Sequence, residues 1–104
     1  MKKVKKVEVV IETIRDYGYI KTNLVGIYDS LEKAKDAMYN RIRSNFEDYL
    51  DDIRIGFKTS DYDSPEDEFE DWISDGFRSP FIWSNTNQNT DAEYCISIQS
   101  SAIE

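Results

Sequence analysis

The stretch DYDSPEDEFEDW, residues 61–72, has a dense cluster of side chains that could bind a cation, because more than half of its residues are acidic and none is basic. Carboxylates at this density can bind a divalent cation or meet a positively charged partner. The D-x-D opening matches the start of an EF-hand calcium loop. However, Pro65 stands where a third oxygen ligand is needed, Glu66 replaces the invariant Gly, and Trp72 replaces the bidentate Glu. We therefore expect no EF-hand and no dedicated metal site, although a cluster of acids can still attract a divalent cation weakly.

The same stretch has the pattern of a loop followed by a short amphipathic helix. Ser64 is a good N-cap and Pro65 a favoured first helical residue. Acids in the first turn complement the helix dipole. An apolar face follows at helical spacing, formed by Phe69, Trp72 and Ile73, and the helix is expected to end at the Asp75-Gly76 pair. The acids between these apolar residues should face water.

The charge of the chain is unevenly distributed along its length. The net charge is −8; residues 1–58 have a balance of +2 and residues 59–104 a balance of −10. Such an asymmetry indicates a directional surface that repels phosphate, so we expect no direct binding of nucleic acid. A solvated helix face without a partner is an equally simple interpretation. The candidate partner-binding residues are Asp61, Asp63, Glu66, Asp67, Glu68, Glu70, Asp71 and Asp75.

The sequence lacks the usual catalytic motifs. It has no histidine, and its one cysteine, Cys95, therefore has no imidazole base. No P-loop, dinucleotide fingerprint, catalytic triad or zinc-ligand spacing is present. We therefore expect no enzyme activity and no cofactor. A single cysteine, no signal peptide and no membrane-length apolar run favour the cytoplasm and no membrane contact.

The elements that must position the acids follow from hydrophobic periodicity. Alternating residues predict strands at 4–14, 19–28, 53–57, 81–84 and 93–100, and Gly18 allows a tight turn between the first two. In the first strand, Val7, Val9 and Ile11 point one way and Glu8, Val10 and Glu12 the other. A long amphipathic helix is predicted at 29–50, capped by Asp29 with Glu32 at the capping-box position.

These elements predict one α+β domain over residues 1–104. An antiparallel sheet of about five strands should carry the long helix on one face, with the short acidic helix beside it. The strand at 53–57 is expected to lie between the two terminal hairpins. The order of strands does not follow from the sequence.

The stretches LVGIYDSLEKAKDAM (24–38) and EYCISIQ (93–99) resemble small acidic α+β proteins of phages and mobile elements, of the anti-CRISPR and anti-restriction type. In these proteins a strand ends in Gly and an aromatic residue, and a short cap leads into an amphipathic helix. The resemblance implies an inhibitor that occupies a nucleic-acid site. It assigns no residue a role, and the nearly balanced first half of this chain departs from a complete DNA mimic.

We therefore expect a small binding protein that inhibits a nucleic-acid-handling host enzyme, such as a CRISPR or restriction nuclease, in the host cytoplasm. Its acidic surface would enter the basic groove of that partner protein. An immunity protein or antitoxin that neutralises a basic toxin would use the same surface. A protein–protein interaction module without mimicry, whose acids only confer solubility, is the third interpretation.

Overall fold

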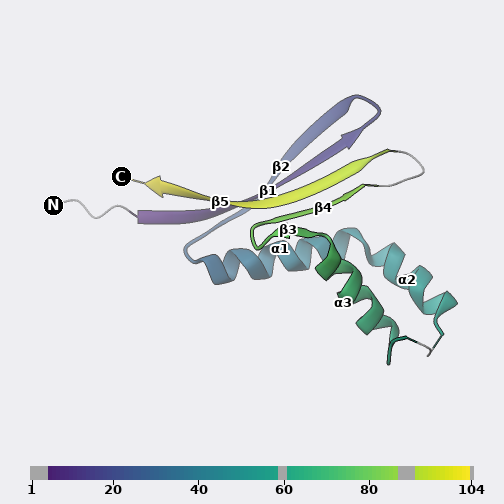
Figure 1. The fold of residues 1–104 in the computed structure, drawn as a ribbon. Helices are drawn as coiled ribbons and strands as arrows, with labels where there is room; N and C mark the ends of the chain where they lie inside the picture. Colours follow the sequence, from purple (N-terminus) through teal and green to yellow (C-terminus); the bar gives the residue numbers. More distant parts are fainter. Residues whose placement is uncertain (1–4, 59–60, 87–90, 104) are drawn as a thin grey trace.

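A computed structural model describes residues 5–58, 61–86 and 91–103. It has an α+β fold in which three helices lie on one side of a five-stranded antiparallel sheet (Figure 1). The elements, in chain order, are β1 (Lys5–Asp16), β2 (Tyr19–Tyr28), α1 (Leu31–Asn45), α2 (Glu47–Gly56), α3 (Pro65–Asp75), β3 (Phe77–Ser79), β4 (Ile82–Thr86) and β5 (Glu93–Ile103).

The sheet has the strand order β2-β1-β5-β4-β3, so the two ends of the chain form neighbouring strands at its centre. β1 pairs along its length with β5, from Lys5 opposite Ile103 to Arg15 opposite Glu93. The β1–β2 hairpin turns at Tyr17 and Gly18, which both have positive φ. Gly18 therefore has the role expected of it, because glycine adopts this conformation without steric cost.

The helices cover the sheet face that carries Val10 and Glu12 of β1. Both side chains are buried, and α1 contacts β1, β2 and β5. The alternation predicted for β1 is therefore confirmed. The side on which the helices pack is unexpected. They cover the face of β1 that carries two glutamates, and the opposite, wholly aliphatic face points away from them, with Val7, Val9 and Ile11.

The segment predicted as one long helix at 29–50 is helical but not continuous, because the chain breaks at Phe46 into α1 and α2. The residue has φ −116° and ψ 24°, outside the helical region. The side-chain amide of the preceding Asn45 donates hydrogen bonds to Glu12 and to the Tyr94 hydroxyl. Tertiary contacts thus redirect the chain after one amphipathic helix. The N-cap is also one residue later than predicted, since the Ser30 hydroxyl accepts the hydrogen bond of the Lys33 amide.

The strand predicted at 53–57 is wrong, because most of this segment is the end of α2. Its alternating Ile53, Ile55 and Phe57 suggested a half-buried strand, but a short apolar run does not distinguish a strand from a helix. In the structure Leu50 and Ile53, three residues apart, are buried on one side of α2, while Ile55 is 86% exposed. The fifth strand is the unpredicted β3, which pairs with β4.

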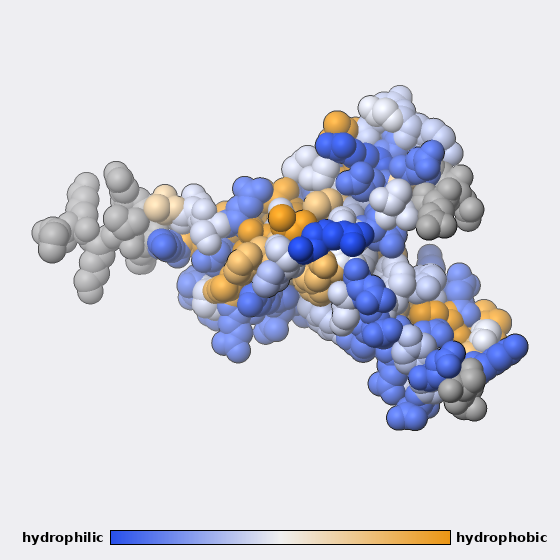
Figure 2. Space-filling model, viewed as in Figure 1, coloured by the Kyte–Doolittle hydropathy of each residue, from blue (hydrophilic) through white to orange (hydrophobic). Residues whose placement is uncertain are grey.

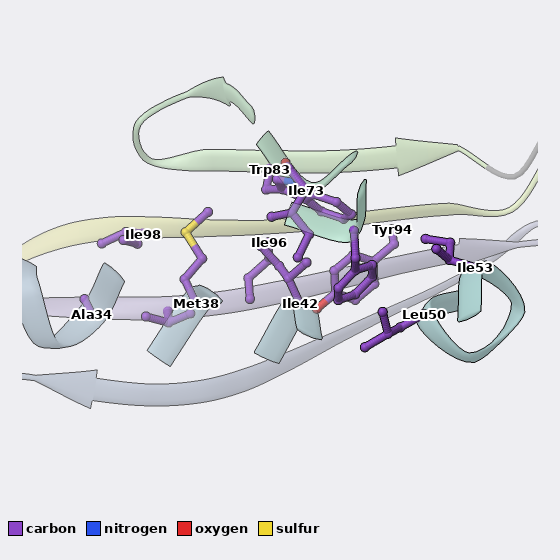
Figure 3. Close-up of a cluster of buried hydrophobic side chains, with 12 residues drawn as sticks. Ala34, Met38, Ile42, Leu50, Ile53, Ile73, Trp83, Tyr94, Ile96 and Ile98 are labelled. Carbon is purple, nitrogen blue, oxygen red and sulfur yellow. The ribbon is translucent and has the colours of Figure 1, made fainter. Parts of the chain in front are cut away.

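The hydrophobic core lies between the sheet and the three helices (Figure 3). Trp83 of β4 is completely buried at its centre, and its indole N–H donates a hydrogen bond to the Ile73 carbonyl of α3 at 2.6 Å. The strand predicted at 93–100 is confirmed as β5, which buries Tyr94, Ile96 and Ile98 in this core. Further buried side chains come from the helices: Ala34, Met38, Ile42, Leu50, Ile53 and Phe69.

Candidate functional site

Six of the eight candidate acids lie on α3, and Asp61 and Asp63 lie just before it. The helix begins as predicted, since the Ser64 hydroxyl accepts a hydrogen bond from the Asp67 amide at 3.2 Å and Pro65 follows the cap. The predicted apolar face of α3 is confirmed as well. Phe69 and Ile73 are buried and Trp72 is half-buried. The carboxylates are therefore attached to a helix that is docked on the core.

Trp72 connects this acidic helix to the other helices and to the sheet. Its ring centroid lies 4.6 Å from that of Tyr49 and 5.0 Å from that of Phe46, where α1 meets α2. It also lies 5.5 Å from Trp83 of the sheet. Aromatic pairs at these distances contribute beyond the area that they bury. The spacing of the charges on α3 is thus held by packing against α2 and β4.

The acids of α3 differ in whether their carboxylates pair with an arginine of another helix. Glu66 accepts hydrogen bonds from the Arg54 guanidinium at 2.9 and 3.2 Å, which lower the pKa of its carboxyl. Glu70 pairs with Arg43 and also accepts a hydrogen bond from Tyr39. These contacts join α3 to α2 and to α1. Glu66 and Glu70 are partly exposed, as expected of acids that face water, and in addition each pairs with an arginine of another helix.

Asp71 accepts a hydrogen bond from the Tyr62 hydroxyl at 2.7 Å, and this contact raises the pKa of Tyr62 to about 12. It closes the segment before α3 onto the helix. Within the described ranges, the carboxylates of the other five candidates take part in no hydrogen bond or ion pair. These candidates are Asp61, Asp63, Asp67, Glu68 and Asp75.

The acidic surface extends onto α2, which was not part of the predicted site. α2 carries four acids. Arg54 near its end contacts Glu66 near the start of α3. Tyr49 near its start contacts Trp72 near the end of α3, so the two helices run antiparallel. Residues 47–75 contain twelve acids and two bases, a net charge of −10, and the remainder of the chain has +2. A charge count centred on this window would have included α2 in the candidate surface. The continuous helix predicted at 29–50 and the strand predicted at 53–57 concealed it.

A groove runs between α2, Trp72 and the end of β4, with a volume of about 370 Å³. The space-filling view shows the molecule hollowed on the side where the sheet and α2 diverge (Figure 2). The groove is lined by two carboxylates, those of Asp48 and Asp52, and by the rings of Tyr49 and Trp72. Carboxylates and aromatic faces both attract a guanidinium or ammonium group. The groove is therefore suited to a basic side chain.

A second charged cluster is buried beneath α1. Glu12 of β1 is 1% exposed and receives a bidentate hydrogen bond from Arg41 of α1, at 2.6 and 2.9 Å. Asn23, Asn45 and the Tyr94 hydroxyl also donate to it. The hydrogen bonds, led by that from Arg41, outweigh desolvation and lower the pKa of Glu12 to about 2.

This cluster was not predicted from the sequence, because nothing in the local sequence pairs Glu12 with Arg41. The available signal was a glutamate between Val10 and Ile14, on a strand face that needs a partner for any charge. Every carboxylate oxygen of Glu12 is occupied by protein donors. The arrangement therefore attaches α1 to the sheet and leaves no oxygen for a substrate.

Cys95 lies half-buried in β5, and burial, followed by the nearby Glu93, raises the pKa of its thiol. It is therefore a protonated thiol at neutral pH. Across the parts of the chain that the structure describes, no three Cys, Asp or Glu side chains come together as a metal site. Nor is any helix of those parts long and apolar enough to cross a bilayer.

Comparison with protein-family models, with curated proteins and with solved structures gives no significant match for this chain.

Proposed function

We propose that this chain is a small binding protein that inhibits a nucleic-acid-handling enzyme by placing its α2–α3 surface in the basic groove of that enzyme. The observation that carries the proposal is the confinement of a net charge of −10 to residues 47–75, while the rest of the chain is nearly neutral. Charge that only confers solubility is mixed and dispersed over a surface. Here it is concentrated on two packed helices.

The spacing of the unpaired charge supports this interpretation. Glu66 and Glu70 are neutralised by Arg54 and Arg43, which leaves four of the six α3 acids. Between residues 66 and 75 the axis extends about 13.5 Å, so roughly one charge remains per 3.4 Å. A single nucleic-acid strand carries one phosphate per about 3.4 Å. A groove that binds such a backbone can therefore accept this helix.

The groove beside Trp72 adds a contact that phosphates do not offer. An arginine of the partner would lie over the aromatic rings of Tyr49 and Trp72 while it pairs with Asp48 or Asp52. Such a contact would slow dissociation, whereas the surrounding charge would accelerate association. The inhibitor would act in the cytoplasm, where its target handles nucleic acid.

The test is capture from a host-cell extract on the immobilised chain, with mass spectrometry of the retained proteins. The expected partner is a nuclease or another enzyme with a basic nucleic-acid groove, displaced by duplex DNA in competition. High salt should strongly lower the rate at which this partner associates with the chain, because exposed charges are screened beyond about 8 Å already at physiological ionic strength. A complex that is indifferent to both salt and DNA would contradict the proposal.

The matched variants change the same number of charges in two places. One quadruple variant carries Asp48→Asn, Asp52→Asn, Asp67→Asn and Glu68→Gln on α2 and α3; the control carries Asp16→Asn, Glu32→Gln, Asp36→Asn and Asp91→Asn. The first should slow association with the purified partner by ~10- to 100-fold, and the control should change it little. Equal effects of the two variants would show that only net charge matters and would reject a defined site.

A further inference from the structure

The sheet has one face that no described helix covers, and its middle is aliphatic. Side chains alternate along a strand, so burial of Val10 and Glu12 under α1 places Val7, Val9 and Ile11 on the opposite face. The structure describes no other element over that face (Figure 1).

Cross-strand register extends this aliphatic surface into both neighbouring strands. Leu24 of β2 lies opposite Ile11, and Ile27 lies opposite Val9. On the other side, Ser97 of β5 links Ile11 to Ile82 of β4. Leu24 and Ile27 are 60% and 58% exposed, and Ile82 is 41% exposed. We call this set the open-face patch: Val7, Val9, Ile11, Leu24, Ile27 and Ile82.

The open-face patch reverses the usual arrangement of a sheet with one covered face. Such sheets place polar residues on the solvent side. Here β1 buries Glu12 beneath the helices and places the half-buried aliphatic residues Val7, Val9 and Ile11 on the open face. The neighbouring positions in β5 are the uncharged Cys95, Ser97 and Gln99. Charged residues lie around the margins of this face: Arg15 is opposite Glu93, Arg78 bonds to the Ser84 hydroxyl, and Lys5 is at the other end of β1. A contiguous apolar patch of this kind marks an interaction surface.

We propose that the open-face patch binds a second copy of this chain, so that two sheets pack face to face about a two-fold axis. A two-fold interface must be complementary to itself, and the uncharged aliphatic middle of this face meets this requirement without any matching of charges. The three long strands have 10, 12 and 11 residues. With the five residues of β4, the whole open face of these four strands measures roughly 600 Å² per protomer, or about 1,200 Å² for the pair, at ordinary strand spacing. Specific interfaces bury more than about 1,000 Å².

The charge distribution also favours face-to-face packing of the sheets over other ways of packing two copies of this acidic chain. Face-to-face packing places the helices, with their −10 region, on the two outer sides of the dimer. Packed sheets lie about 10 Å apart and each helix layer is about 10 Å thick, so the helix layers would be about 30 Å apart. Repulsion across several Debye lengths is screened. Both acidic surfaces would also stay accessible for the proposed inhibitory contact.

The experiment is sedimentation velocity and light scattering of the full chain across a wide range of protein concentration. The wild type should have the mass of a dimer at micromolar concentration. Leu24→Glu combined with Ile27→Glu should raise the dissociation constant at least ~100-fold, because each protomer places carboxylates against an apolar partner. Leu24→Thr combined with Ile27→Thr removes apolar contact but retains strand propensity, so it should weaken the dimer with the fold intact. Circular dichroism reports the fold of each variant.

Ile55→Glu is the matched control, because Ile55 is the most exposed aliphatic residue of α2 and lies outside the open-face patch. It should leave the dimer unchanged. A wild type that remains monomeric, or a dimer that survives both double variants, would overturn the proposal. If the wild type is monomeric and the threonine variant loses capture of another protein, the patch binds that protein and not a second copy.

Discussion

Replacement of Glu12 by Gln tests whether the buried ion pair under α1 stabilises the fold through charge. The amide has nearly the same volume, so the core around it need not repack. The substitution removes the charge that Arg41 contacts at 2.6 Å. Arg41 is 42% exposed, so its guanidinium can regain water when the pair is lost. The main cost is therefore the lost charge-assisted bonding of one carboxylate.

The magnitude follows from the pKa of Glu12, which is lowered from 4.5 to about 2. Each pKa unit corresponds to 1.36 kcal/mol, so ionised Glu12 stabilises the folded state by about 3 kcal/mol. The folded pKa lies below the unfolded one. This stabilisation is therefore present above about pH 5 and is lost as the pH falls toward 2. At pH 3 roughly 2 kcal/mol of it should already be gone.

The assay is urea unfolding of wild type and Glu12→Gln at pH 7 and pH 3, followed by tryptophan fluorescence. We expect a difference in unfolding free energy of about 3 kcal/mol at pH 7 that shrinks to about 1 kcal/mol at pH 3. At about 4 °C per kcal/mol, the melting temperature should fall by ~12 °C at pH 7. Glu8→Gln, in the same strand and bonded to Ser100, is the control and should change stability by less than about 0.5 kcal/mol.

A difference that stays the same at both pH values would refute this reasoning, because a neutral packing defect does not titrate. A difference below about 1 kcal/mol at pH 7 would show that desolvation cancels the pair, as it does in many buried ion pairs.

Two further predictions concern the packing that holds α3. A Cβ at Gly76 would overlap the buried indole of Trp83, whereas nothing lies near Gly56; Gly76→Ala should therefore destabilise the protein by ~1–3 kcal/mol in urea unfolding, and Gly56→Ala should be neutral or slightly stabilising. The Gly76 result would be contradicted if both variants unfolded alike. Trp72→Ala should cost about 3 kcal/mol and accelerate hydrogen exchange across residues 61–77, while Ile55→Ala should not. Unchanged exchange in the Trp72 variant would show that α3 is held by other contacts.

Local signals in the sequence determined the elements whose own residues specify them. Ser64 and Pro65 start α3 and Phe69 and Ile73 define its buried side, because capping and helical periodicity act within one turn. The hairpin turn at Gly18 and the alternation of β1 and β5 were predictable for the same reason. The unequal distribution of charge, and hence the acidic candidate site, was also visible without any structure.

Tertiary structure decided the features that depend on residues distant in the chain. Phe46 interrupts the long helix because its ring packs among Trp72, Trp83 and Tyr94, and Ile53 is helical because it docks with α2 on the core. The periodicity of β1 defined two faces but could not say which one the helices cover. Burial of Glu12 depends on an arginine 29 residues away, and that pairing leaves the aliphatic face open. Only the folded chain brings such partners together, because the free energy of each long-range contact depends on all the others.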